Sequence, residues 1–468
     1  VKEFQKLFLD ESPAFAIEWD KEVVAYDPTA IMGEPLEILH YPAWSRVKGW
    51  ELNPTTTQDT IVIAQTGPCP TEGMMDIVST SYYDLTVYDN VFDGLAEREN
   101  LDTLAMVPAL ATGWEVADDG KTWTVNLRQG VKFHDGVEFT ADDVLFTFAS
   151  AMDPALASQA GAWLATVLGS ADNIEKVDDY TVKFNLPEPY AYFVSGVLDT
   201  FMLPKHILEN VPLEDWRSHP FNTCVGTYDA GGFPFTGPIG TGPYIYAGFD
   251  ATTNTNTISR NDDYWNAQAL WDAGKFEIMN IVVVFIEESD PAITALKNGE
   301  VDVLDSQYHL QTKLDSIVEP WGAYVTYDAF GVQELGCNML HPVIGTGVDT
   351  PLGQEDPSRA AEAARYVRKA LSHLIPRQSI VDTILGGFGT PGATVAILPL
   401  TEGYDPTLVA DTYDPDLAKS LLAAAGYDTG VPPPSAGFLE EYGLYVAVAV
   451  VVIVVAIGAV YFIRRRKT

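Results

Sequence analysis

Cysteine is scarce in this chain, with three cysteines among 468 residues: Cys69, Cys224 and Cys337. They lie far apart, form no CxxC pair and have no histidine at metal-ligand spacing, so neither a disulfide framework nor a zinc site is predicted. We interpret them as singletons in the core or on the surface, with one chance pair left open. The sequence predicts no cofactor and no metal.

Basic residues are scarce as well. There are 27 Lys and Arg residues against 65 Asp and Glu residues, which gives a formal net charge of −38. Binding of nucleic acid needs cations that neutralise phosphates, so this balance argues against a nucleic-acid partner. Hydrophobic residues nevertheless make up 47% of the chain. That is enough for a folded core, unlike the composition of a disordered acidic tail.

Catalytic and nucleotide-binding motifs are also missing. The chain contains neither HExxH nor GxSxG, and His134-Asp135-Gly136 is most simply a turn before a strand. The glycine-rich stretch at Gly240 and Gly242 opens a strand and carries no lysine, so it is not predicted to bind a phosphate. An enzyme is the rival class of protein, and these absences argue against it.

The C-terminal region contains one long run without charge, from Tyr442 to Ile463. A helix of about 20 apolar residues spans the hydrocarbon core of a bilayer, so residues 442–463 are predicted to form a transmembrane helix. The basic tail 464–468 is then cytoplasmic by the positive-inside rule, and the body is extracellular. The proline-rich segment 431–441 is predicted to be a stiff stalk between body and membrane.

Patterns of helix and strand alternate through the body, which indicates an α/β architecture. A hairpin is predicted around Asp119-Gly120, and a helix capped by Thr140 follows it. Further on, Asp356 is predicted to cap a helix that Pro376 ends, with a second helix after it. Asp414 and Pro415 are predicted to start a last helix that ends at Gly426.

Several stretches, taken in order, resemble the motif series of the family 5 solute-binding proteins. They include "GWEVADDGKTWTVNLRQGVKFHDGVEFTADDVLFTF", "GTGPYIY", "RNDDYW", "ALKNGEVDVL" and "AKSLLAAAGYD", within residues 58–428. That family comprises the oligopeptide, dipeptide and nickel receptors of ABC importers. The resemblance implies a multi-lobed α/β fold of the periplasmic-binding-protein type II kind, hinge closure on a ligand, and ABC permease and ATPase subunits as partners. A C-terminal membrane tether is similar to what archaeal members use.

The resemblance also implies a division into parts: a first lobe at 54–109 and 188–260, a small satellite lobe at 110–187, and an incomplete second large lobe at 261–430. Residues 1–53 resemble the closing segment of the family, here placed first. An upstream tandem copy, a splice in the gene prediction or assembly, and a circular permutation each explain this order. In each case the second large lobe lacks its middle, so weak ligand binding is expected.

The resemblance aligns Ser81, Tyr82 and Tyr83 of "TSYYD" with the first-lobe loop that faces the ligand cleft. It aligns Asn338 of "ELGCNML" with the strand that faces the cleft from the other side. Core packing or an ordinary surface position remains open for each, since a tyrosine has both an apolar body and a polar tip. Trp265 of "RNDDYW" is expected to be structural.

The resemblance therefore implies an extracytoplasmic solute-binding component of an ABC importer that captures peptides and delivers them to a permease. The seven histidines are scattered, which favours peptide over nickel. Two alternatives stay open: an oligosaccharide-binding receptor of the same family, and a degenerate surface protein without a transport role.

Overall fold

We analysed a computed structural model of the chain, which describes residues 1–32, 47–99, 105–395, 397–399 and 403–431. The described residues fall into two compact units. The continuous unit comprises residues 23–325, and the split unit combines residues 1–22 with the chain from residue 326 onward. The division of the chain into lobes in the sequence analysis remains a prediction.

The largest sheet has eight strands in the order β11-β12-β13-β2-β14-β1-β15, with β16 paired to β1. The strands are β1 (Ala14–Tyr26), β2 (Thr60–Gln65), β11 (Tyr244–Asp250), β12 (Thr255–Arg260), β13 (Asn280–Phe285), β14 (Val303–Leu304), β15 (Ala323–Gly336) and β16 (Gly389–Pro391). Strand β2 is parallel to both β13 and β14, with Ile61 opposite Ile281 and Ile63 opposite Val303. These side chains are buried, as expected for parallel strands covered on both faces.

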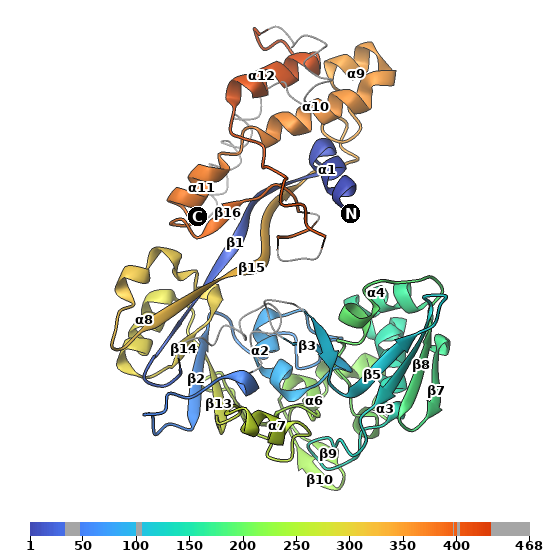
Figure 1. Ribbon diagram of the computed structural model, residues 1–468, viewed down its shortest axis with the longest axis vertical. Helices are drawn as coiled ribbons and strands as arrows, with labels where there is room; N and C mark the ends of the chain where they lie inside the picture. Colours follow the sequence, from blue (N-terminus) through green and yellow to red (C-terminus); the bar gives the residue numbers. More distant parts are fainter. Residues whose placement is uncertain (33–46, 100–104, 396, 400–402, 432–468) are drawn as a thin grey trace. The chain divides into compact units, whose positions relative to one another are not determined.

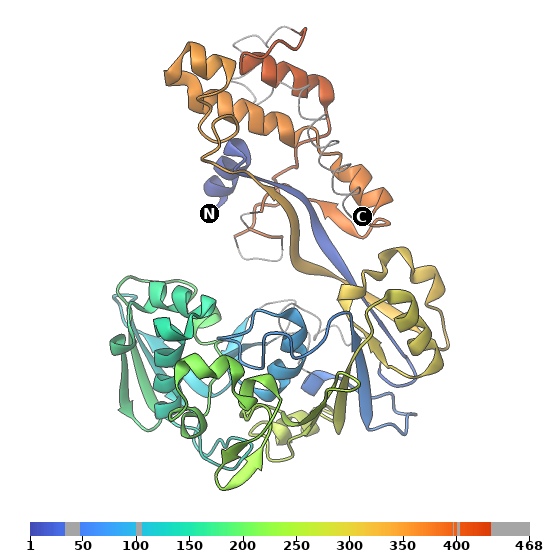
Figure 2. The ribbon, with the colours of Figure 1, turned by 180° about the vertical axis from the view of Figure 1, so that it is seen from behind.

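Strands β1 and β15 contain the points at which the chain passes from one unit to the other, and they run side by side in both views (Figures 1 and 2). Strand β1 pairs antiparallel with β16 through Glu18 and Trp19, and with β14 through Ala25 and Tyr26. The N-terminal segment of this chain is therefore a structural part of the main sheet.

A second sheet of four strands, β5-β6-β8-β7, belongs to the continuous unit, and α3 packs against it (Figure 1). Its elements are β5 (Ala111–Val116), β6 (Thr122–Leu127), α3 (Ala141–Met152), α4 (Gln159–Leu168), β7 (Ile174–Asp178) and β8 (Thr181–Asn185). Gly120 has a φ of 68° in the β5–β6 turn. Thr140 and Asp143 form a reciprocal capping box at the start of α3. The predicted hairpin and helix start are confirmed.

Shorter elements complete the continuous unit. They are α2 (Tyr82–Val91), β3 (Ala96–Arg98), β4 (Met106–Pro108), α5 (Lys205–Leu208), α6 (Pro220–Thr223), β9 (Tyr228–Ala230), β10 (Phe233–Phe235), α7 (Ala267–Asp272) and α8 (Ser289–Asn298).

The glycine motif of the continuous unit serves close packing. A Cβ atom on Gly240 would lie 2.0 Å from the carbonyl oxygen of Val91, and the N–H of Gly242 donates to that same oxygen at 2.9 Å. The His134 ring joins this contact: its Nε2 lies 3.0 Å from the Gly242 carbonyl oxygen, and the N–H of Gly240 donates to its Nδ1 at 3.4 Å. The neutral ring with hydrogen on Nε2 makes both bonds. Burial accordingly lowers the pKa of His134 to about 4.

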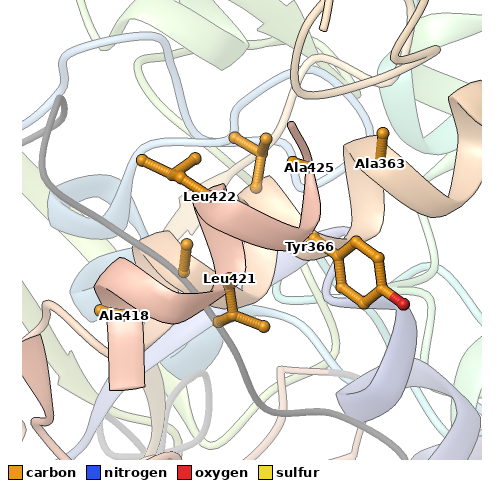
Figure 3. Close-up of a cluster of buried hydrophobic side chains, with 8 residues drawn as sticks. Ala363, Tyr366, Ala418, Leu421, Leu422 and Ala425 are labelled. Atoms are coloured by element: carbon orange, nitrogen blue, oxygen red, sulfur yellow. The ribbon is translucent and has the colours of Figure 1, made fainter. Parts of the chain in front are cut away.

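The split unit contains five α-helices among its described residues: α1 (Lys2–Glu11), α9 (Pro351–Glu355), α10 (Ala360–Ser372), α11 (Arg377–Thr383) and α12 (Pro415–Ala424). Helices α10 and α12 pack through small and aliphatic side chains, among them Ala363, Leu421 and Leu422 (Figure 3). Asp414 caps α12 as predicted. Asp356 caps a 3-10 turn that precedes α10, because its carboxylate accepts from the N–H of Ser358 and the α-helix begins only at Ala360.

Three buried cations of α10 and α11 bind the main chain of the N-terminal segment. Arg368 donates to the carbonyl oxygen of Glu11 at 2.7 Å, Lys369 to that of Leu9 at 3.0 Å, and Arg377 to that of Ala16 at 2.7 Å. Lys369 also forms an ion pair with Asp411 at 3.0 Å. The bonds from Arg368 and Lys369 satisfy carbonyl groups at the end of α1, which an isolated helix leaves without partners. The bond from Arg377 reaches strand β1.

No helix among the described residues is long and apolar enough to cross a membrane. The transmembrane helix predicted at 442–463, its basic tail and nearly all of the predicted stalk lie outside the described residues.

Replacing Lys369 by Met is expected to destabilise the protein by about 3–5 kcal/mol, because it leaves the Asp411 carboxylate buried without its cation. The matched control is Lys419→Met, since Lys419 pairs with Asp416 in an exposed position. That change is expected to cost less than about 1 kcal/mol. Urea unfolding followed by circular dichroism measures both. Equal midpoints for the two variants would contradict the proposed role of Lys369.

The stability of the protein is expected to depend on pH through His134. A histidine whose pKa is lowered in the folded state takes up its proton more readily when unfolded. Folding free energy is therefore lost as pH falls from about 6.5 to about 4, by up to about 3 kcal/mol for this group. We expect His134→Gln to flatten the pH dependence of urea unfolding relative to the native protein. An unaltered slope in His134→Gln would refute this assignment.

Candidate ligand-binding site

The carboxyl ends of three parallel strands, β2, β13 and β14, meet at one edge of the main sheet within the continuous unit. Thr66 and Gly67 follow β2, Ile286 follows β13, and Asp305 and Ser306 follow β14. In α/β sheets, ligands bind outside the carboxyl ends of the strands. This edge is therefore the candidate site.

Two of the predicted site residues are bonded to this edge. The hydroxyl of Tyr83 lies 3.2 Å from the hydroxyl of Thr66, and the hydroxyl of Tyr82 lies 3.2 Å from that of Ser306. The two tyrosine rings pack edge to face, with centroids 6.0 Å apart. The structure thus joins two tyrosines of α2 to residues that directly follow or lie just beyond β2 and β14.

The start of α2 is held in place by Asp84, whose side chain is fully buried. Its carboxylate accepts the main-chain N–H groups of Thr71, Glu72 and Gly73 at 2.6–2.8 Å and the hydroxyl of Ser79 at 3.0 Å. The loop before α2 is therefore tied to the helix itself. Tyr82 and Tyr83 are the first two residues of α2, so their main chain lies next to this constrained loop.

Ser81 is the residue that precedes α2, and it is half-buried. Its N–H donates to the Ser79 hydroxyl at 3.1 Å, and its own hydroxyl donates to that of Thr71 at 3.2 Å. Ser81 is therefore tied to the loop before α2, next to Tyr82 and Tyr83 in the sequence.

Tyr308 joins the ends of β14 and β13, since its hydroxyl donates to the Ile286 carbonyl oxygen at 2.7 Å. Burial raises the pKa of Tyr308 well above its usual value, so it stays protonated. Asp305 is fully buried and accepts the N–H of Gln307 at 2.8 Å. Thr66, Asp305 and Ser306 were not among the residues predicted from the sequence. The available signal was a polar residue directly after two of the three buried strands, β2 and β14.

Asn338 lies in the split unit, just after β15, so it is described apart from the other three predicted residues. It is exposed, and its side-chain oxygen accepts the N–H of Leu340 at 3.0 Å in a local turn. Trp265 has contacts that suit the structural role expected of it: its indole N–H donates to Asp93 at 3.1 Å, and Arg128 stacks on its ring.

The edge presents hydroxyl groups and aromatic rings. Hydroxyl groups can donate and accept hydrogen bonds, and aromatic faces can stack on a ligand. Among the residues that the structure describes, no cluster of three His, Cys, Asp or Glu side chains could hold a metal ion.

Comparison with solved structures defines the fold class. The oligopeptide-binding protein AppA from Bacillus subtilis, solved with a nonapeptide, aligns with a TM-score of 0.57 at 24% identity, over 82% of this chain and 66% of that one. DppA from Helicobacter pylori, solved with the peptide STSA, aligns with a TM-score of 0.54 at 23% identity, over 79% and 66%. The fold is therefore the type II periplasmic-binding-protein fold of the α/β class, as predicted.

The chain belongs to the bacterial extracellular solute-binding proteins, family 5, because the model of the family's middle region matches residues 105–433. AppA of Bacillus subtilis is 26% identical to it over 371 residues, which is 75% of this chain and 59% of AppA. Di/tripeptide-binding protein 3 of Pseudomonas aeruginosa is 29% identical over 365 residues, which is 74% and 60%. The chain thus spans about three-fifths of these relatives.

The relatives are solute-binding proteins rather than enzymes, in agreement with the missing catalytic motifs. The family comprises extracellular proteins, which agrees with the predicted body outside the cytoplasm.

Gly67 provides a test of the site geometry. A Cβ atom on Gly67 would lie 2.3 Å from a ring carbon of Tyr83, so Gly67→Ala must displace that ring. We expect a loss of about 1–3 kcal/mol in unfolding free energy, as for other overpacked positions. Gly49→Ala is the control, because a Cβ atom there meets nothing within 4 Å. The double variant Gly67→Ala/Tyr83→Ala should show no further loss beyond that of Tyr83→Ala. Additive losses would contradict the contact.

Proposed function

We propose that the protein is the extracytoplasmic solute-binding component of an ABC importer, which captures peptides and hands them to a membrane permease. The observation that carries the proposal is a pair of hydrogen bonds at the carboxyl edge of the parallel strands. One joins Tyr82 to Ser306, and the other joins Tyr83 to Thr66. The match to family 5 over residues 105–433 and the peptide-binding relatives support it.

The tyrosines have a direct part in this proposal. A peptide offers main-chain N–H and C=O groups, and the hydroxyls of Tyr82 and Tyr83 can exchange their bonds to Ser306 and Thr66 for bonds to these groups. The edge-to-face rings offer apolar surface to the side chains of the ligand. Ser81 adds a further hydroxyl, and Asn338 is proposed as a contact from the split unit.

Residues 442–463 are proposed to anchor the body to the cell membrane as a single span, with residues 464–468 in the cytoplasm. A tethered receptor stays close to the permease, which raises its effective concentration there.

Peptide binding can be tested on two proteins: the 468-residue chain, and a version extended with the portion of a family relative that the chain does not span. We expect the extended version to retain peptides from a mixed pool of di- to octapeptides at micromolar affinity, about 8 kcal/mol. The 468-residue chain, which spans about three-fifths of the length of AppA, is expected to bind them more weakly. Calorimetric titration and mass spectrometry of the retained peptides measure both.

Two tyrosine variants of the extended version refine the test. Tyr82→Phe removes the hydroxyl at the candidate edge, and Tyr180→Phe removes a hydroxyl that bonds Glu138 from the turn between β7 and β8. We expect only Tyr82→Phe to weaken peptide binding, by about 1 kcal/mol for one hydrogen bond. If the extended version retains oligosaccharides and no peptides, the proposed peptide ligand is wrong and the oligosaccharide alternative is supported. If the extended version retains neither, the transport role is refuted.

A further inference from the structure

We propose that the split unit contains a second binding site, a pocket for an uncharged aromatic ring, which is separate from the candidate edge and does not depend on the proposed transport role. The pocket has a volume of about 540 Å³ and lies between the start of α11, strand β16 and residues 404–413. Ligand pockets in proteins commonly measure about 300–1,000 Å³ and have mainly apolar and aromatic walls.

The walls are aromatic and aliphatic. Trp19 of β1 and Tyr404 meet edge to face, with ring centroids 5.6 Å apart and an angle of 87° between the rings. Pro391 and Leu408 add apolar surface, and Tyr413, which is 57% exposed, stands at the rim. An additional ring could meet these rings in offset or edge-to-face contact, the arrangements that aromatic pairs prefer.

The Trp19 ring is held firmly. Its indole N–H donates to the carbonyl oxygen of Thr394 at 3.1 Å, and the residue is 8% exposed. This wall is therefore preformed, which reduces the entropy lost on binding.

The charged groups of the pocket are already engaged by the protein. Each nitrogen of the Arg377 guanidinium donates within the fold: Nε to Ala16, and the two terminal nitrogens to Ser372, with one of them also to the Asp411 carbonyl oxygen. The Asp411 carboxylate is paired with Lys369. A charged ligand would lose its hydration without gaining a counter-ion, so the pocket favours a neutral ring.

Direct binding of N-acetyl-tryptophanamide, a neutral indole amide, tests the site on the full 468-residue chain. Saturation-transfer NMR and calorimetric titration are expected to show saturable binding, with N-acetyl-alaninamide and N-acetyl-lysinamide binding much more weakly. If the alanine amide binds equally well, or if no probe saturates the protein, the proposed specificity for an aromatic ring is wrong.

Matched variants locate the site. Tyr413→Ala removes a rim ring that is 57% exposed, and Tyr192→Ala removes a ring that is 56% exposed in the continuous unit. We expect Tyr413→Ala to weaken binding of the indole amide about fivefold, as loss of one aromatic contact predicts, and Tyr192→Ala to leave it unchanged. Tyr404→Ala is the second pocket variant, with circular dichroism to confirm its fold. Unchanged affinity in both pocket variants would overturn the proposal, even where peptide transport holds.

Discussion

The position of strand β1 is the constraint on which the rest of the structure depends. The three cations Arg368, Lys369 and Arg377 hold its approach and its first residues by their carbonyl oxygens, at 2.7–3.0 Å. Buried carbonyl groups without partners are costly, and buried cations without partners more so, so each group satisfies the other. Strand β1 then continues into pairing with β14. Beside β14 lies β2, whose carboxyl end belongs to the candidate site.

This arrangement gives the N-terminal segment a structural role in this chain. That role is the same for each of the three explanations of the segment order. Helix α1 ends against α10, and β1 pairs within both units. It also supplies Trp19 to the aromatic pocket. The aromatic pocket therefore includes a residue that the resemblance assigns to the end of the family's fold, and strand β1 pairs with β14, one of the strands of the candidate edge.

The two regions differ in chemistry. The edge at Tyr82 and Tyr83 presents hydroxyl groups whose bonds, at 3.2 Å, are longer than is usual for hydroxyl pairs and can be exchanged with a ligand. The pocket at Trp19 and Tyr404 presents rings, while its charged groups are engaged by the protein. A polar main chain suits the first region and an apolar ring suits the second.

The sequence by itself determined the local elements and the family. Thr140 with Asp143, and Asp414 with Pro415, predict helix starts, because caps act on main-chain groups two or three residues away. The family could also be predicted from the sequence, because each of its motifs is a short local pattern and the motifs occur in the expected order. Ser81, Tyr82, Tyr83 and Asn338 entered as candidates only through that resemblance.

Only the tertiary structure decided which distant residues meet. Tyr82 bonds Ser306 across 224 positions, and Lys369 bonds the Leu9 carbonyl across 360. Residues 2–26 lie in the segment that resembles the closing part of the family. Their positions beside β14, β16 and α10, however, arise from burial and hydrogen bonding across the fold. Such contacts follow no periodicity along the chain, because they depend on how whole elements pack against one another.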